Sequence, residues 1–302
     1  MSMRIISFFR SIMGMLSFLS VMLCACSNET STIPEEEGNS KTFTFQVTNY
    51  MQYAMDEGTR AAIAPSASKR IQHLALGIFD ATADTLVAPI QIQNKEDQGY
   101  GSFTAKLNYG KYRLVFLGYG GSNSILIMED PKEISFENNT LPQTFLSSFE
   151  FTVDANTAAT TSVVLKRVVS GFELTMADAI SSRTSGIKIK STGGGMVLNA
   201  KTGFAKASTG RENTIDIPES YHGLTGKSVI FYLFLPDTEE VMDIQASAVD
   251  KNGEAFIERT FAKVPMKINT LTIYQGNFFA DSPYGFSITM EDDWGEEVTN
   301  SF

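Results

Sequence analysis

Histidine, cysteine and tryptophan are all scarce in this chain. Its 302 residues include two histidines, two cysteines and one tryptophan. Structural zinc sites use four ligands, mostly cysteine and histidine. His73 and His222 lie far apart in the sequence, with no cysteine near either of them. The chain contains no nucleophile elbow, no H-E-x-x-H motif and no phosphate-binding loop. The sequence therefore predicts no enzyme activity, no metal site and no cofactor.

Positive charge is also in short supply. The chain has 34 acidic residues against 24 lysines and arginines, which gives a net charge of −10. This balance argues against nucleic acid as a partner and against electrostatic binding to anionic lipid. The acidic run MEDDWGEE (residues 290–297) lacks the spaced ligands of an EF-hand loop. We expect a solvated acidic tail there.

The apolar run nearest the N-terminus is too short to cross a membrane. SIMGMLSFLSVML (residues 11–23) holds about 13 residues, whereas a spanning helix needs roughly 20. Arg4 and Arg10 precede the run, and no acidic residue occurs before Glu29. A basic segment followed by a short apolar segment is typical of an export signal. We predict a lipoprotein signal peptide over residues 1–25.

The two cysteines lie at the end of this segment, in Leu23-Cys24-Ala25-Cys26. The order of an aliphatic residue, two small residues and a cysteine resembles a bacterial lipobox with Cys26 as the lipidated residue. Cys24 would then leave with the signal peptide, and no cysteine would remain for a disulfide. The rival interpretations are a disulfide and a Cys-x-Cys metal site, and the shortage of histidine argues against the metal site. We expect Cys26 to anchor the chain in outer-membrane lipid.

A polar segment follows Cys26. Residues 26–41 are rich in serine, asparagine, threonine and glutamate, and they cannot pack a core, so they are interpreted as a flexible tether. Glu29 resembles the acidic residue of a surface-export signal in Bacteroidales-type lipoproteins. An ordinary polar linker is the alternative for this residue.

From residue 42 onward the apolar residues alternate, which predicts an all-β chain. TFTFQVT (residues 42–48) places Phe43, Phe45 and Val47 on one face, and it is the first of about fifteen candidate strands, which are separated by glycine-rich turns. This number is too large for one β-sandwich and fits two in tandem. We predict an N-terminal sandwich over residues 42–157 and a C-terminal sandwich over residues 158–302. The boundary is placed in the polar stretch VDANTAATT.

One arginine stands in a flexible stretch between the first two strands. Arg60 is surrounded by small and polar residues, as are many sites of proteolytic cleavage. A protease that cuts after arginine would make Ala61 the new N-terminus. An arbitrary surface arginine is the plainer interpretation of Arg60 taken alone.

Several stretches together resemble the Bacteroidales-type fimbrillin superfamily of pilus tip, shaft and anchor subunits. They are the lipobox at Cys26, the tether, the early strand, Thr59-Arg60-Ala61, KRVVSGFELTM and the closing KINTLTIYQGNFF and FSITMEDDW. The resemblance implies two transthyretin-like (Greek-key) β-sandwich domains. It also implies a lipoprotein of the cell outer membrane that assembles into a fimbrium and acts in adhesion.

The resemblance further implies that an arginine-specific protease removes the leading strand. Loss of Phe43, Phe45 and Val47 would open an apolar groove that a strand from another fimbrial subunit fills. Little sequence follows Trp294, so a tip or anchor subunit is expected rather than a shaft subunit. The alternatives are a surface glycan-binding lipoprotein of β-sandwich build and a β-sandwich hydrolase.

Overall fold

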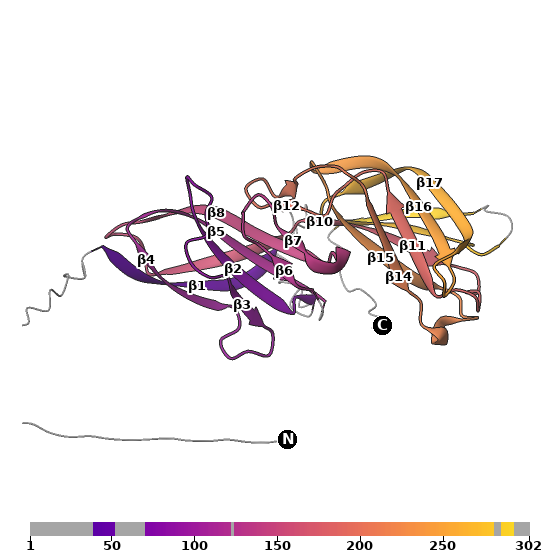
Figure 1. Cartoon of the computed structure of the whole chain (residues 1–302), viewed down its shortest axis with the longest axis horizontal. Coiled ribbons are helices and arrows are strands. Elements are labelled where there is room, and N and C mark those ends of the chain that lie inside the picture. Colours follow the sequence, from indigo (N-terminus) through magenta and orange to yellow (C-terminus); the bar gives the residue numbers. More distant parts are fainter. Residues whose placement is uncertain (1–38, 52–69, 122–123, 281–284, 293–302) are drawn as a thin grey trace, which may run out of the picture. The chain divides into compact units, whose positions relative to one another are not determined.

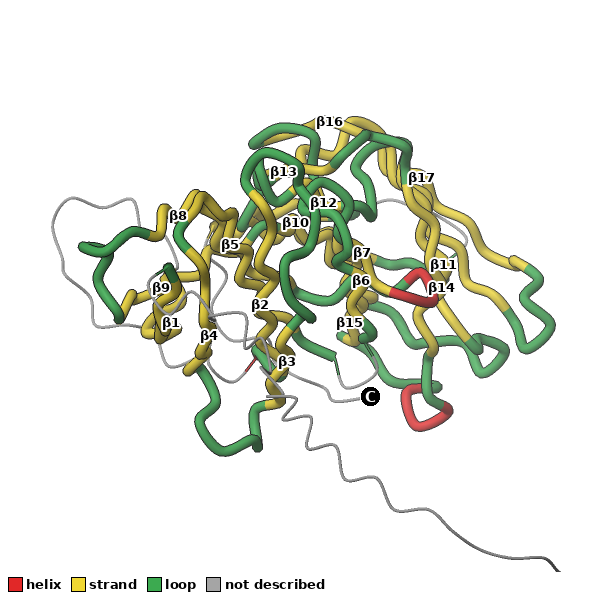
Figure 2. The backbone as a smooth tube through the Cα atoms, turned by 60° about the vertical axis from the view of Figure 1, so that its left-hand side comes forward, coloured by secondary structure: helices red, strands yellow, loops and turns green. Residues whose placement is uncertain are grey.

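The computed structural model describes residues 39–51, 70–121, 124–280 and 285–292, and it confirms the all-β prediction (Figure 1). These residues belong to one compact unit, Asn39–Phe302. They form nineteen strands and two 3-10 turns, η1 (Glu137–Asn139) and η2 (Glu219–Tyr221). Figure 2 shows how little of the backbone is helical. No helix within the described ranges is both long and apolar enough to cross a membrane.

The first half of the described chain forms a seven-stranded sheet. In sheet order, its strands are β3 (Gln91–Asn94), β2 (His73–Asp80), β5 (Gly110–Tyr119), β8 (Thr144–Val153), β9 (Thr160–Arg167), β1 (Ser40–Met51) and β4 (Ser102–Asn108). The side chains of Gln91 and Gln93 on β3 donate to the carbonyls of Thr104 and Ser102, at 3.1 and 2.7 Å. Because β3 and β4 are the two edges, these bonds show that the sheet curves until its edges meet.

The second half forms two four-stranded sheets that enclose a common core. One has the order β15 (Lys227–Phe234), β10 (Val169–Met176), β18 (Thr270–Gly276) and β19 (Ser287–Asp292). The other has the order β14 (Arg211–Asp216), β11 (Gly186–Ser191), β16 (Glu239–Val249) and β17 (Ala255–Lys267). Two small pairs complete the described strands: β6 (Leu126–Ile127) with β7 (Ser135–Phe136), and β12 (Leu198–Asn199) with β13 (Phe204–Ala205).

Alternation along the strands decides which side chains enter which core. On β5, Leu114 and Phe116 point into the core of the seven-stranded sheet, whereas Val115 and Leu117 belong to a separate buried cluster on the opposite face. A strand with both faces covered has no polar alternation, which explains the continuous apolar run in this part of the sequence. The cluster on the outer face also contains Phe234 and is called the shared cluster below.

The predicted boundary between two domains, at residues 157 and 158, lies in the turn between β8 and β9 of the seven-stranded sheet, and the division into two domains stays a prediction. The stretch VDANTAATT forms the end of β8, the turn and the start of β9. Strand β9 then pairs in parallel with β1 and in antiparallel with β8. The change of sheet comes at Val168, between β9 and β10. Polar, small residues mark a turn within a sheet as readily as a linker between domains.

Candidate functional site

The first candidate site is the position that strand β1 occupies in the seven-stranded sheet. This strand lies inside the sheet, between β4 and β9. Residues 40–46 pair in antiparallel with β4, and residues from Thr44 to Met51 pair in parallel with β9. The Thr44 N–H donates to the Ala159 carbonyl at 2.7 Å, and the Val47 N–H donates to the Gly101 carbonyl at 2.8 Å. Successive peptide groups of β1 therefore bond to opposite neighbours.

The phenylalanines predicted to fill the core do so. Phe43 and Phe45 are both fully buried. The ring of Phe43 meets Phe151 edge to face with centroids 5.1 Å apart, and the ring of Phe45 lies 5.6 Å from Phe116. Val47, also predicted, is partly buried and packs against the same cluster. Edge-to-face aromatic pairs contribute beyond their buried area, so these two rings hold β1 in place.

A charged contact fixes the start of β1. The Lys41 ammonium donates to the carbonyl of Ala155 at 3.3 Å and also to the carbonyl of Thr157. Both belong to the turn between β8 and β9. The Thr157 hydroxyl donates to the Asp154 carboxylate at 2.8 Å, and this bond is the main reason that the pKa of Asp154 is lowered. The turn thus presents its carbonyls to Lys41.

The other predicted site residues lie outside the described residues. They are Cys26, the expected lipid attachment point, and Arg60 and Ala61, the expected cleavage position. Arg60 belongs to residues 52–69, which connect the end of β1 to the next described segment. In sequence, therefore, the predicted cleavage position lies between β1 and the rest of the sheet.

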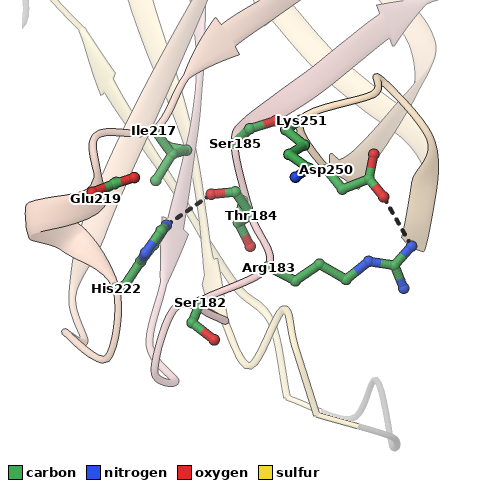
Figure 3. A pocket seen from close by; sticks show the side chains of 9 residues that line it. All are labelled: Ser182, Arg183, Thr184, Ser185, Ile217, Glu219, His222, Asp250 and Lys251. Atoms are coloured by element: carbon green, nitrogen blue, oxygen red, sulfur yellow. Dashed lines mark hydrogen bonds and ion pairs between the residues drawn. The ribbon is translucent and has the colours of Figure 1, made fainter.

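A second candidate site is an open pocket of about 370 Å³ in the second half of the chain (Figure 3). Three connections line it: the loop from β10 to β11, the loop from β14 to β15 that contains η2, and the turn from β16 to β17. The His222 Nε2–H donates to the Thr184 carbonyl at 2.8 Å, which joins the first two connections. The pocket is therefore built from segments far apart in sequence.

An ion pair joins the third connection to the first. A guanidinium nitrogen of Arg183 lies 3.1 Å from the Asp250 carboxylate. Backbone N–H groups of Asn252 and Glu254 donate to the same carboxylate, at 2.9 and 3.2 Å. These bonds lower the pKa of Asp250, and the bond from the Asn252 N–H has the largest effect. Arg183 also lies over the ring of Phe256, 4.6 Å from its centroid, so its position is fixed on two sides.

The histidines noted in the sequence have structural partners. His73 Nδ1 lies 2.9 Å from the Asn94 side-chain oxygen, and its ring stacks on Tyr119 at 5.0 Å. Burial raises the pKa of Tyr119 to about 12. Across the described ranges, no group of three or more histidine, cysteine, aspartate or glutamate side chains is arranged to hold a metal ion. His222 lines the pocket, a role that the sequence pattern did not indicate.

The chain was compared with known families and proteins. A family model described as a family of unknown function (DUF6562) matches residues 35–301. No curated protein matches the chain.

Among solved structures, a candidate adhesin from Bacteroides ovatus is 12% identical with a TM-score of 0.49, and the match covers 87% of this chain and 97% of that one. The tip fimbrial protein Mfa3 from Porphyromonas gingivalis, with a C-terminal truncation, is 13% identical with a TM-score of 0.39, covering 83% and 100%. The fimbrial anchor protein Mfa2 from the same organism is 11% identical with a TM-score of 0.39, covering 85% and 98%.

Proposed function

The chain belongs to DUF6562, a family of unknown function, and we propose that it is a non-catalytic subunit of a bacterial surface fimbrium. In this proposal the chain travels to the outer membrane as a lipoprotein anchored through Cys26. It joins other fimbrial subunits by strand addition and acts in adhesion. The lipobox and the polar tether support the route to the surface.

The observation that carries the proposal is the position of β1. It is an inner strand with two fully buried phenylalanines, and Arg60 follows it in sequence before the next described strand. Cleavage after Arg60 would cut the only covalent connection between β1 and the rest of the sheet. Strand β1 would then be held by hydrogen bonds and packing alone.

The free-energy cost of removing β1 from the sheet explains why another strand would take its place. Each buried phenylalanine contributes about 1.5–3 kcal/mol relative to an exposed one. Loss of β1 would also leave unpaired N–H and C=O groups along β4 and β9, and unpaired strand edges recruit other strands. A strand with alternating apolar residues from a neighbouring subunit restores both the apolar burial and the backbone hydrogen bonds. Repeated head to tail, the contact gives an open filament.

We place the subunit at the tip or the anchor of the fimbrium rather than in its shaft. Strand β19 is the last described strand, and it pairs with β18 within its own sheet. The Asp292 carboxylate at its end accepts a hydrogen bond from the Thr270 hydroxyl at 2.6 Å and lies 3.2 Å from the Lys267 ammonium. Strand β19 would have to leave β18 before it could be donated to another subunit.

Sequencing the N-terminus of the protein from the cell surface tests the proposal. We expect a start at Ala61 in polymers formed with an arginine-specific protease, together with assemblies that resist SDS. A lasting start at lipidated Cys26 within assemblies indicates the anchor position. The variant Arg60→Lys should block cleavage, whereas the matched control Arg70→Lys should not.

A surface glycan-binding lipoprotein is the second candidate function. The pocket of Figure 3, which several polar side chains line, favours it. Such a protein would keep β1 and remain a monomer whether or not the protease is present. A protease-indifferent monomer would therefore exclude the fimbrial proposal.

A further inference from the structure

The pocket of Figure 3 contains polar groups that nothing in the described chain uses. The side chains of Ser182, Glu219 and Lys251 line it and are exposed. None of the three makes a hydrogen bond or an ion pair with another described residue. Sites for small molecules combine apolar walls with a few polar groups that orient the ligand.

Around the pocket, Arg183 and Lys251 offer more N–H donors than the Asp250 carboxylate accepts. The negative charge of Asp250 is already matched by Arg183 and by two backbone N–H groups. Arg183 uses one nitrogen for that contact, and a guanidinium has five N–H donors. Lys251 adds an ammonium that has no hydrogen-bond or ion-pair partner among the described residues. The lining carries two cations and two carboxylates, and because Asp250 is already paired, Arg183 and Lys251 leave N–H donors free for a negative group on their side of the pocket.

The pocket also offers complementary features for a sugar ring. The Glu219 carboxylate accepts hydrogen bonds from hydroxyl groups, and the Ser182 hydroxyl both donates and accepts. Ile217 is buried at the wall of the pocket and offers an apolar surface to ring C–H groups. The volume of about 370 Å³ lies within the range of small-molecule sites.

We propose that this pocket binds a carboxylated sugar, with the sugar carboxylate at Lys251 and Arg183 and its hydroxyls at Glu219 and Ser182. A metal ion does not fit, because the unpaired Lys251 ammonium would repel it. The inference goes beyond the proposed assembly function. It does not depend on exchange of β1, so a failed sugar titration and a failed cleavage experiment are distinguishable.

The pocket lies away from the shared cluster that joins the two halves of the described chain. Strand β10 begins at Val169, in the shared cluster, and ends at Met176, just before the loop that carries Arg183. Strand β15 runs the other way, from Lys227 to Phe234 in the same cluster. The pocket therefore lies at the ends of these strands that are far from the shared cluster.

Calorimetric titration of the full chain tests the proposal with three acidic sugars and one neutral sugar that matches the first of them except at the carboxylate. The probes are methyl β-glucuronide, its neutral partner methyl β-glucoside, methyl galacturonide and the methyl glycoside of N-acetylneuraminic acid. We expect at least one acidic sugar to bind with a Kd near 1 mM or below and at least about tenfold more tightly than the glucoside. Lys251→Gln should weaken that binding about tenfold, and Lys251→Glu should abolish it.

The matched control is Lys111→Gln, which removes the same charge from an exposed position on β5. It should leave sugar binding unchanged, and both lysine variants should keep the thermal unfolding midpoint of the parent chain. Equal affinity for glucuronide and glucoside, no binding of any acidic sugar, or unchanged binding in Lys251→Gln would overturn the proposal. Tighter binding of an acidic peptide such as N-acetyl-Asp-Glu would overturn the assignment to sugars.

Discussion

Two phenylalanines carry much of the binding energy of β1. Phe45 is fully buried and contacts Phe116 and Phe151, with centroids 5.6 and 5.4 Å apart. Phe45→Ala should lower the free energy of unfolding by about 3–5 kcal/mol, because it removes transfer energy and leaves a cavity. Urea unfolding followed by circular dichroism measures the change. Thr42→Ala, on the exposed face of the same strand, is the control and should change stability by less than about 0.5 kcal/mol.

A second prediction at the residue scale concerns Asp84. Its carboxylate lies 2.6 Å from the Lys132 ammonium and 3.0 Å from that of Lys201. The hydrogen bond from Lys132 is the first cause that lowers the pKa of Asp84 below its usual value of 3.8. A lowered folded-state pKa means that the ion pairs stabilise the fold above about pH 4 and that this stability is lost as the pH falls through the folded-state pKa.

Asp84→Asn should therefore lower the unfolding midpoint at pH 7 and make its decline below pH 4 shallower. Thermal melts between pH 7 and pH 2 measure both effects. Glu96→Gln removes one exposed acidic charge and serves as the control. A parallel decline in Asp84→Asn and the parent chain would contradict the prediction.

At the scale of the element, β1 must leave the seven-stranded sheet if the subunit assembles by strand exchange. Thr44 lies directly opposite Thr104 on β4, and its N–H bonds to β9 instead. The two threonines therefore form a non-hydrogen-bonded pair, where the Cα atoms of antiparallel strands come closest. This spacing lies within the range of a disulfide.

The double variant Thr44→Cys, Thr104→Cys should lock β1 to β4 when oxidised. We expect protease-treated protein to remain monomeric under oxidation and to polymerise after reduction, as judged by SDS-resistant ladders. Each single variant should polymerise under both conditions. Polymers from the fully oxidised double variant would show that assembly does not need the departure of β1.

The pairing of β1 also shows what sequence patterns can establish about an element. The alternation of Phe43, Phe45 and Val47 predicted a strand with one buried face, and the structure has that strand. Nothing in the pattern indicated β9 as its parallel neighbour. Parallel partners are far apart in sequence and share no turn, so they are found only when the sheet has formed.

At the scale of the whole molecule, the shared cluster joins strands from both halves of the described chain. It contains Val115 and Leu117 of β5 as well as Phe234 of β15. The Arg211 guanidinium of β14 donates to the Asn139 carbonyl of η1 at 2.9 Å and to the Tyr232 carbonyl at 2.7 Å. Burial lowers the pKa of this guanidinium to about 10, and these bonds compensate part of the cost of burying its charge.

Because the cluster is common to both halves, we expect them to unfold together. Calorimetry should show one transition in which the calorimetric and van't Hoff enthalpies agree. Phe234→Ala should lower the free energy of unfolding by about 3–5 kcal/mol. It should also reduce the hydrogen-exchange protection of β5 and β10 alike. Two separate transitions in the parent chain would contradict this prediction.

Local information in the sequence determined the all-β class and the burial of Phe43 and Phe45, because the alternation of apolar residues acts over a few residues. The position of β9 and the change of sheet at Val168 were decided by pairing between distant segments. The pocket likewise needs Arg183, His222 and Asp250 from three connections. Only the tertiary structure brings such residues together, because the strands that support them find their register through long-range packing.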